Sequence, residues 1–232
     1  MLEVRDLTAG YEDIEVLRRV SFDVREGEVV ALFGPNGHGK STLLKVIAGA
    51  HPPTSGTVSF RGEDITGFPA HAIVARGVAY IAEERHLFTE MSVWENLHLG
   101  AYNKAARQRI DHNLKLVYGV FPRLAERQNQ LCSTLSGGEG RMVAIARGLM
   151  SGAALLLVDE PSIGLAPGLK KTVYEAIGKI NRDAGITVLL VEQEIDHALH
   201  LATRAYVLKQ GAVLFERPID EVDVEEIKEA YF

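Results

Sequence analysis

The residues best suited to chemistry lie between positions 34 and 42, where three glycines precede a lysine and two hydroxyl side chains. Residues 34–41 read GPNGHGKS, a full match to G-x-x-x-x-G-K-[ST]. Glycine has no Cβ, so such a loop can curl with its N–H groups toward phosphate oxygens. Lys40 would add a positive charge beside the terminal phosphates, and Ser41 would offer a hydroxyl to Mg²⁺. The nucleotide-binding residues expected here are Gly34, Pro35, Asn36, Gly37, His38, Gly39, Lys40, Ser41 and Thr42; His38 holds a position of the pattern that accepts any residue.

A second candidate for chemistry is the acid pair that ends residues 154–160, ALLLVDE. In α/β sheets the C-terminal end of a buried strand faces the ligand crevice, so two carboxylates there call for an explanation. We expect Asp159 to hold Mg²⁺ through water and Glu160 to act as general base on an attacking water. An acidic turn at a strand end is common by itself. Together with the glycine loop, the pair favours a site that hydrolyses a nucleotide.

A third segment, LSGGE at 135–139, opens an apparent helix that runs to Met150. Serine followed by two glycines leaves N–H groups accessible at a helix N-terminus, which is a second place for an anion. One nucleotide does not need two such places on one chain. We therefore expect this segment to serve a nucleotide held by another subunit.

Strands and helices must position these residues, and the hydrophobic pattern predicts both. Apolar and charged residues alternate near the N-terminus, which predicts a half-buried antiparallel sheet. Short apolar runs without alternation predict strands buried on both faces. Buried strands are expected at 28–33, 78–82, 154–158 and 186–191, helices at 41–48, 103–118, 139–150, 167–183, 193–202 and 220–229, a hairpin around Gly211, and mainly loops at 49–77.

The order of these elements predicts an α/β protein with a parallel core. Strands and helices alternate on both sides of a helical stretch, which indicates an inserted α-helical lobe. We expect one domain over 1–232, in which 1–83 and 151–232 form the core with an N-terminal antiparallel β subdomain and 84–150 form an α-helical subdomain. No repeat, low-complexity segment or linker divides the sequence into independent domains.

Composition excludes several classes of protein. The 232 residues carry a formal net charge of −6, with 47% hydrophobic and 24% charged residues, which is typical of a globular chain. An acidic chain is poorly suited to bind nucleic acid, which requires surplus Lys and Arg. The single cysteine, Cys132, cannot form an internal disulfide. No signal-peptide pattern is present, and apolar runs are far shorter than the roughly 20 residues of a membrane span. We therefore expect a cytoplasmic location.

GPNGHGKST at 34–42, LSGGE at 135–139 and ALLLVDEP at 154–161, in this order, resemble the ATP-binding cassette (ABC) ATPases. The resemblance covers essentially the whole chain. It implies a P-loop NTPase fold with a RecA-like parallel core, and ATP and Mg²⁺ as ligands. It further implies that Tyr11, 29 residues before Lys40, stacks on adenine. Ser136, Gly137 and Gly138 would then cap the γ-phosphate of the opposite subunit, and Ser162–Ala166 would cross the dimer interface.

The sequence departs from this family pattern at three places. Glu83 stands where the family has a glutamine that senses Mg²⁺, and Gln193 stands where it has a histidine that senses the γ-phosphate. Gly140-Arg141 replace a usual pair of glutamines. Gln193, which we count with Glu160 and Lys40 as catalytic, can donate a hydrogen bond but cannot carry a proton. His197 is a possible substitute for the missing histidine; a solvated position on a helix is the alternative.

YIAEERHLF (80–88), MSVWENL (91–97) and VLLVEQ (188–193) resemble the ATPase subunits of branched-chain amino acid importers. Urea and short-amide importers share these features, so the solute stays open. The resemblance implies pairing with itself or with a sibling ATPase, beneath two permeases supplied by a periplasmic solute-binding protein, on the inner face of the membrane. Leu87, Phe88, Met91 and Trp94 would offer an apolar groove to a permease helix, with core packing as the alternative.

Three other functions are alternatives to an ATPase subunit of an importer. ABC ATPases of chromosomes and DNA repair insert long coiled coils between the two loops, whereas Lys40 and Ser136 are only 96 positions apart here. A small-molecule kinase would leave LSGGE and SIGLA unexplained. A regulatory nucleotide-binding subunit with little hydrolysis stays open, because the sensing histidine is absent.

Overall fold

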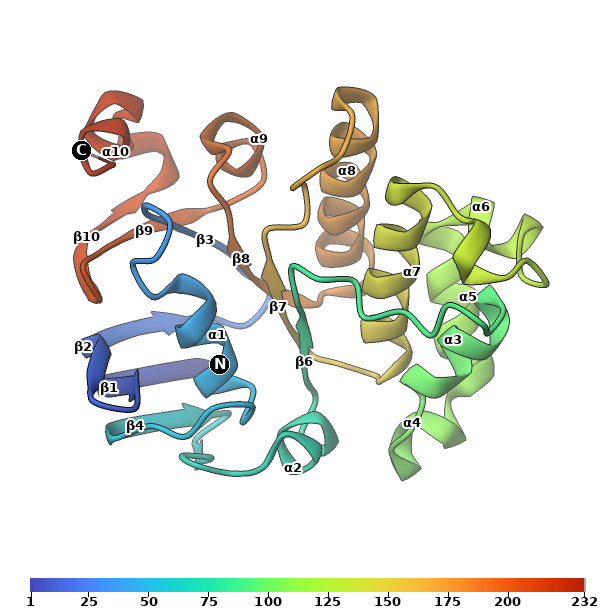
Figure 1. Ribbon diagram of the computed structural model, residues 1–232, viewed down its shortest axis with the longest axis horizontal. Coiled ribbons are helices and arrows are strands. Elements are labelled where there is room, and N and C mark those ends of the chain that lie inside the picture. Colours follow the sequence, from blue (N-terminus) through green and yellow to red (C-terminus); the bar gives the residue numbers. More distant parts are fainter. Residues whose placement is uncertain (232) are drawn as a thin grey trace.

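The strands form two sheets in the computed structural model, which describes residues 1–231 (Figure 1). The smaller sheet is antiparallel and comes from the N-terminal part of the chain. Its strand order is β2-β1-β4-β5. These strands are β1 (Leu2–Tyr11), β2 (Ile14–Val24), β4 (Ser55–Phe60) and β5 (Glu63–Asp64).

The larger sheet has the order β10-β9-β3-β8-β7-β6 and forms the core of the molecule. Neighbouring strands from β9 to β6 are parallel, and β10 pairs with β9 in the antiparallel sense. This arrangement confirms the predicted α/β class with a parallel core and an antiparallel β region. The strands are β3 (Val29–Phe33), β6 (Val78–Ile81), β7 (Leu155–Asp159), β8 (Thr187–Val191), β9 (Arg204–Lys209) and β10 (Ala212–Pro218).

Helices cover both faces of the larger sheet (Figure 1). Helix α1 lies between the two sheets, whereas α7 and α8 lie on the opposite face, with α3–α6 gathered on the far side of α7. Within residues 1–231 every helix is too short or too polar to cross a membrane. The helices are α1 (Lys40–Ile47), α2 (Ala70–Ala75), α3 (Val93–Gly100), α4 (Lys104–Gln108), α5 (Ile110–Val120), α6 (Pro122–Glu126), α7 (Gly137–Met150), α8 (Pro167–Ala184), α9 (Ile195–Leu199) and α10 (Val224–Glu229).

Strand β3 shows why its sequence is apolar at every position. Val30 and Leu32 belong to the hydrophobic core shared with α1 and the antiparallel sheet. Val29, Ala31 and Phe33 point the other way, into the core shared with α7 and α8. Successive side chains of a strand face opposite sides, so a strand between two cores needs apolar residues throughout. The loop that follows β3 is thereby fixed from both faces of the sheet.

Several local predictions differ from the structure; the helix expected over 193–202 is the shorter α9, and the one expected over 220–229 is a 3-10 turn at Ile219–Glu221 followed by α10. The expected helix over 103–118 is two helices, because the chain leaves helical geometry at Arg109, with φ −117° and ψ 18°. The expected loop region 49–77 contains β4, β5 and α2. The alternation of β1 is interrupted by a register shift between Val4 and Leu7, where Asp6 has φ +45°. Strands β1 and β4 pair with each other across about 50 positions, a contact that local patterns do not record.

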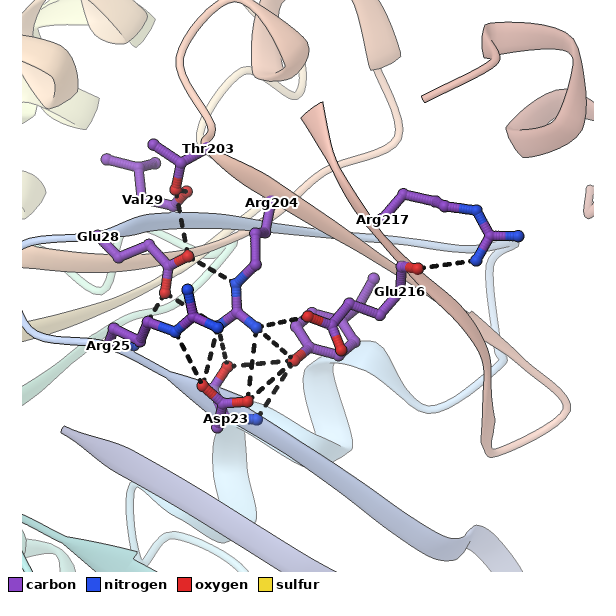
Figure 2. Close-up of polar contacts among 9 residues, drawn as sticks. Asp23, Arg25, Glu28, Val29, Thr203, Arg204, Glu216 and Arg217 are labelled. Atoms are coloured by element: carbon purple, nitrogen blue, oxygen red, sulfur yellow. Dashed lines mark hydrogen bonds and ion pairs between the residues drawn. The ribbon is translucent and has the colours of Figure 1, made fainter. Parts of the chain in front are cut away.

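A buried arginine ties the two sheets together (Figure 2). Arg204 at the start of β9 donates to Glu28 Oε1 at 2.6 Å and to Asp23 Oδ2 of β2 at 3.0 Å. It also pairs with Glu216 on β10. Burial alone would raise the pKa of Glu28, but hydrogen bonds from Arg204 and the Arg25 N–H bring that pKa below its usual value. The cluster links the antiparallel sheet to the strands beside β3.

Candidate nucleotide-binding and catalytic site

Four neighbouring strands bring the predicted site residues to one edge of the larger sheet. The strands β3, β8, β7 and β6 are parallel and adjacent, so their C-terminal ends meet at the same edge. The glycine loop follows β3, and Glu83 follows β6. Asp159 ends β7 and Glu160 comes next, while Gln193 follows β8. Segments far apart in sequence thus form one site through strand order alone.

The glycine loop is held in a conformation that other residues would not adopt. Gly34 has φ +150°, and a Cβ there would lie 2.1 Å from the carbonyl oxygen of Leu208. Gly39 has φ +102° and caps the N-terminal end of α1. The first N–H groups of a helix have no partner within it, and the helix dipole is positive at this end. The loop and α1 therefore form a site for an anion such as a phosphate.

Lys40 lies across this loop with its side chain almost fully buried, at 4% exposure. Its Nζ donates to the carbonyl oxygens of Gly34 at 2.7 Å and Pro35 at 3.1 Å. Glu160 Oε1 is 3.9 Å from the same nitrogen. Burial lowers the pKa of Lys40, and the nearby carboxylates oppose that shift. The ammonium group is thus placed between the loop and the acid pair, where phosphate oxygens would meet it.

Ser41 and Asp159 supply the oxygen atoms that Mg²⁺ prefers. Ser41 Oγ donates to Asp159 Oδ1 at 3.2 Å, and the hydroxyl of Tyr80 donates to Asp159 Oδ2 at 2.9 Å. Burial raises the pKa of Asp159, and these two hydrogen bonds oppose the shift. Over residues 1–231 no three His, Cys, Asp or Glu side chains converge as a complete metal site. The donors fit Mg²⁺, which commonly takes one or two carboxylates together with substrate phosphates.

Glu160 is held by the neighbouring strand end and by unusual backbone geometry. Gln193 Nε2 donates to Glu160 Oε2 at 2.6 Å, and the Glu160 N–H donates to the carbonyl oxygen of Val191 at 2.9 Å. Glu160 has φ +42°, a left-handed conformation that non-glycine residues seldom adopt. Such strain persists only where surrounding contacts enforce it, and it is frequent at functional sites. The carboxylate is therefore fixed before any ligand binds.

These residues surround one hollow of about 360 Å³. Glu83 joins them there, with its pKa raised by partial burial and by the charges of Glu160 and Asp159. Val16, which was not expected from the sequence, and Ile163, from the loop 162–166 expected at the dimer interface, complete the lining. The predicted residues that line the hollow are Asn36, Gly37, Gly39, Lys40, Ser41, Thr42, Glu83, Glu160 and Gln193.

Tyr11 does not line this hollow. Its ring packs at a tilt of 34° against His51, with centroids 4.3 Å apart, and both residues line a different, larger hollow. His51 is itself anchored by a hydrogen bond between its Nε2 and the carbonyl oxygen of Gly10 at 2.7 Å. One face of Tyr11 is thus covered by His51, and stacking on adenine stays a prediction.

Ser136, Gly137 and Gly138 also lie outside the hollow. Ser136 caps α7: its hydroxyl accepts the Glu139 N–H at 3.4 Å, and Glu139 Oε2 accepts the Ser136 N–H at 3.0 Å. Hydrogen bonding from Ser136 lowers the pKa of Glu139. Ser136 and Gly137 are exposed. This chain does not bring the segment to its own glycine loop, so the predicted contact with a second subunit's nucleotide stays a prediction.

Two histidines have structural surroundings rather than a place at the site. The Nδ1 atom of His38 accepts the Gln210 N–H at 3.1 Å, which ties the glycine loop to the β9–β10 turn. The ring of His197 stacks on Tyr174 with centroids 5.0 Å apart, and His197 does not line the hollow. Gln193 therefore occupies the place beside Glu160, without help from His197.

Two residues at the site were missed in the sequence. Tyr80, the donor to Asp159, lies in the run VAYIA, where it reads as an ordinary strand aromatic. Glu192 is 2% exposed and accepts the N–H groups of Ser162 at 3.3 Å and Gln193 at 3.1 Å. Burial raises its pKa. A carboxylate that directly follows a buried strand was the available signal for Glu192; for Tyr80 only strand order reveals the contact.

Comparison with known proteins points to one family. Residues 17–163 match the family described as ABC transporter. The chain is 42% identical to the high-affinity branched-chain amino acid transport ATP-binding protein BraG of Pseudomonas aeruginosa, covering 92% of this chain and 91% of that protein. It is 36% identical to the probable branched-chain amino acid transport ATP-binding protein LivF of Archaeoglobus fulgidus, covering 96% and 94%.

A solved structure extends this comparison to the fold. A dimeric post-hydrolysis state of an ATP-binding cassette bound to ADP and Pi superposes with a TM-score of 0.80 and 26% identity, covering 94% of this chain and 99% of that one. The glycine loop, the acid pair and the LSGGE segment described above agree with these findings: the family match, the two relatives covered over most of their length, and the shared fold. The chain therefore belongs to the ABC transporter family and is one of its ATP-binding ATPases.

Proposed function

We propose that this chain powers an importer of branched-chain amino acids, or of related small amides or urea, by hydrolysing ATP. The observation that carries this proposal is the hollow in which Lys40, Glu160 and Gln193 meet at the ends of three neighbouring strands. The names of BraG and LivF support the class of solute.

The chemistry follows from which group faces which. The triphosphate lies on the N–H groups of residues 34–42 with Lys40 beside its terminal phosphates. Ser41, Asp159 and Glu83 would hold Mg²⁺, which neutralises charge on the phosphate oxygens when bound. Glu160 accepts a proton from the water whose oxygen attacks the γ-phosphorus, and ADP leaves as the bond to its oxygen breaks. Gln193 keeps the Glu160 carboxylate aimed at that water.

Pairing with a second ATPase subunit, identical or sibling, would complete the site. Ser136–Gly138 are remote from the chain's own hollow, while Ile163 in the loop 162–166 is 45% exposed. An exposed apolar side chain at the rim of the nucleotide hollow suits a subunit interface. Bound ATP would favour the closed pair because it contacts both subunits only in that state. Hydrolysis removes these contacts and reopens the pair.

A second surface suits the permeases. A hollow of about 1200 Å³ lies between α2, β6 and α7, and its rim carries Phe88, Leu99 and Tyr102, which are 53%, 41% and 72% exposed. Trp94 lies outside the lining of this hollow; it is 44% exposed and packs at a tilt against the ring of His98, so it is not a core residue. Exposed aromatic side chains around a concave apolar surface favour docking of a helix. We infer that permease helices dock here, which would place the subunit on the inner face of the membrane, with a periplasmic solute-binding protein across it.

Co-purification tests this function. The chain is expressed with its neighbouring permeases in membranes, and a tag on this chain is used to isolate the complex. We expect the complex to hydrolyse ATP faster when the solute-binding protein is loaded with leucine, isoleucine, valine, urea or a short amide. A complex with Glu160→Gln is the matched control and should stay inactive. Failure to recover permeases, or hydrolysis that none of these solutes changes, would contradict the proposal.

A further inference from the structure

The backbone of Ala82 and Glu83 is attached to helix α7 by an arginine, while Arg147 further along α7 donates to the carbonyl oxygen of His86 at 2.9 Å. Arg141, one turn into α7, is 2% exposed. Its Nη1 donates to the carbonyl oxygen of Ala82 at 2.8 Å, and its Nη2 donates to the carbonyl oxygen of Glu83 at 2.5 Å. A guanidinium presents its donors in a fixed planar fork, so two bonds to successive carbonyls set both position and orientation. The backbone that carries Glu83 is therefore held from α7.

A second arginine makes the reverse contact. Arg85 Nη1, from the Glu83 segment, donates to the carbonyl oxygen of Gly137 at 3.0 Å. The side chain passes directly over Gly140, where a Cβ would lie 3.0 Å from Arg85 Nη1 and 3.3 Å from its Cδ. Gly140 therefore leaves the room that Arg85 occupies. The two segments hold each other's backbone in both directions.

This reciprocal contact costs folding free energy. The Nε atom of Arg141 is buried and has no hydrogen-bond partner among the described residues. A buried donor without a partner is unfavourable, and a neutral side chain would avoid that cost. The two outer nitrogens, however, bind the carbonyls of the two peptides that flank the Glu83 Cα. The arrangement favours positional control of Glu83 over stability.

We propose that Arg141, Arg85 and Gly140 form a clasp that makes the Glu83 segment and the N-terminal end of α7 move as one body. The Glu83 side chain lines this chain's own nucleotide hollow. Ser136–Gly138 begin the same α7 that Arg141 occupies. Engagement of Glu83 by ATP and Mg²⁺ thus sets where Ser136–Gly138 lie for the second subunit's nucleotide. Arg141 and Arg85 are positioning residues in this scheme, which rests on the pairing of subunits proposed above.

The experiment separates binding from turnover. In the purified complex with permeases, kcat and KM for ATP are measured for Arg141→Met, Arg141→Lys and Arg85→Gln. Binding of a fluorescent ATP analogue is measured on the isolated chain. Arg123→Gln, which removes an exposed arginine that pairs with Glu126 on α6, is the control. Thermal unfolding of each variant shows whether it folds. If Arg141→Met does not fold, Arg85→Gln still tests the clasp, because Arg85 is exposed and its substitution should leave the fold intact.

We expect kcat to fall about ten- to hundredfold in Arg141→Met and Arg85→Gln, since small displacements of positioned groups cost this much. Binding to the isolated chain should change by less than about twofold, because the glycine loop is untouched. The kcat of Arg141→Lys, which keeps one charged donor group, should lie between the kcat of Arg141→Met and that of the unsubstituted chain. Arg123→Gln should match the unsubstituted chain.

Two results would overturn the clasp: an unchanged kcat in Arg141→Met and Arg85→Gln, or a loss of analogue binding that parallels the loss of kcat. The second result would mean that the arginines only stabilise the local site. A different result would refute the proposed function instead: the complex with the unsubstituted chain hydrolyses no ATP, or the Glu160→Gln chain with Mg-ATP forms no dimer, alone or with its sibling.

Discussion

Gln193 Nε2 lies 2.6 Å from Glu160 Oε2, so the residue after β8 donates a hydrogen bond to the carboxylate after β7. An amide nitrogen can donate to a carboxylate but cannot take a proton from water. Under the proposed mechanism, Gln193 would orient Glu160 without competing for its role as base. The same carboxylate is 3.9 Å from Lys40 Nζ, so in the proposed mechanism it would lie between the phosphates and the attacking water.

Removing this donor should slow hydrolysis less than removing the base. We expect Glu160→Gln to lower the steady-state ATPase rate by about 10²- to 10⁴-fold, the range for a positioned general base. Gln193→Ala leaves the carboxylate in place, still held by its backbone, and should lower the rate by about tenfold. The two rates are compared under saturating Mg-ATP. Losses of similar size would show that Gln193 is as essential as Glu160.

Removing the Tyr80 hydroxyl should weaken Mg²⁺ binding. Tyr80→Phe keeps the ring but deletes the donor 2.9 Å from Asp159 Oδ2, so the carboxylate loses the group that fixes its orientation. Outer partners of metal ligands commonly contribute about 10- to 100-fold in metal affinity. We expect the Mg²⁺ concentration that half-saturates ATPase activity to rise by about tenfold or more. Tyr102→Phe, an exposed tyrosine that does not line the nucleotide hollow, serves as the control. An unchanged Mg²⁺ requirement in Tyr80→Phe would contradict this prediction.

The Arg204 cluster predicts how stability depends on pH. Because the pKa of Glu28 is lowered in the folded chain, its contribution is fully present above the unfolded-state pKa of about 4.5 and is lost as pH falls through the folded value. In Arg204→Leu the buried Glu28 loses its charged donor, so its folded pKa should rise. We expect the free energy of unfolding to drop by about 3–5 kcal/mol near pH 7, as for other broken buried ion pairs.

The loss in free energy of unfolding caused by Arg204→Leu should be smaller near pH 4, because there Glu28 becomes protonated and no longer needs a charged partner. Urea unfolding of the variant and of the unsubstituted chain at the two pH values measures this loss. Arg217→Leu is the matched control, because Arg217 and its partner Glu226 are both about 40% exposed on the surface, at 41% and 39%. Its free energy of unfolding should change by less than about 1 kcal/mol. A deficit in Arg204→Leu that is equal at both pH values would contradict the role given to Glu28.

The proposed permease surface predicts a separation of transport from ATP binding. Phe88→Ala and Trp94→Ala truncate exposed aromatic side chains, so the isolated chain should fold and bind ATP as before. Aromatic anchors dominate many interfaces, and we expect transport in vesicles to fall by about tenfold or more. Ile14→Ala, at an exposed apolar residue on the β1–β2 hairpin, is the control. Loss of folding in Phe88→Ala or Trp94→Ala would show that these side chains are part of the core.

The sequence by itself determined the glycine loop, the acid pair, the LSGGE helix start and the α/β class. Each of these depends on short-range chemistry: glycines where a side chain would clash, apolar runs for strands buried on both faces, and a serine with Glu139 three residues later to cap a helix. Such signals lie within a few residues of each other, so the pattern contains them in full. Gly34 and β3 are clear examples.

Only the tertiary structure decided which of these residues meet. Tyr80 reaches Asp159 because β6 pairs with β7, and Gln193 reaches Glu160 because β8 pairs with β7 on its other side. Arg141 reaches the Glu83 backbone across 58 positions. Strand order and side-chain conformation arise from packing of the whole chain, so no local pattern records these contacts. The same reason explains why the contact between the rings of Tyr11 and His51, 40 positions apart, was not predicted.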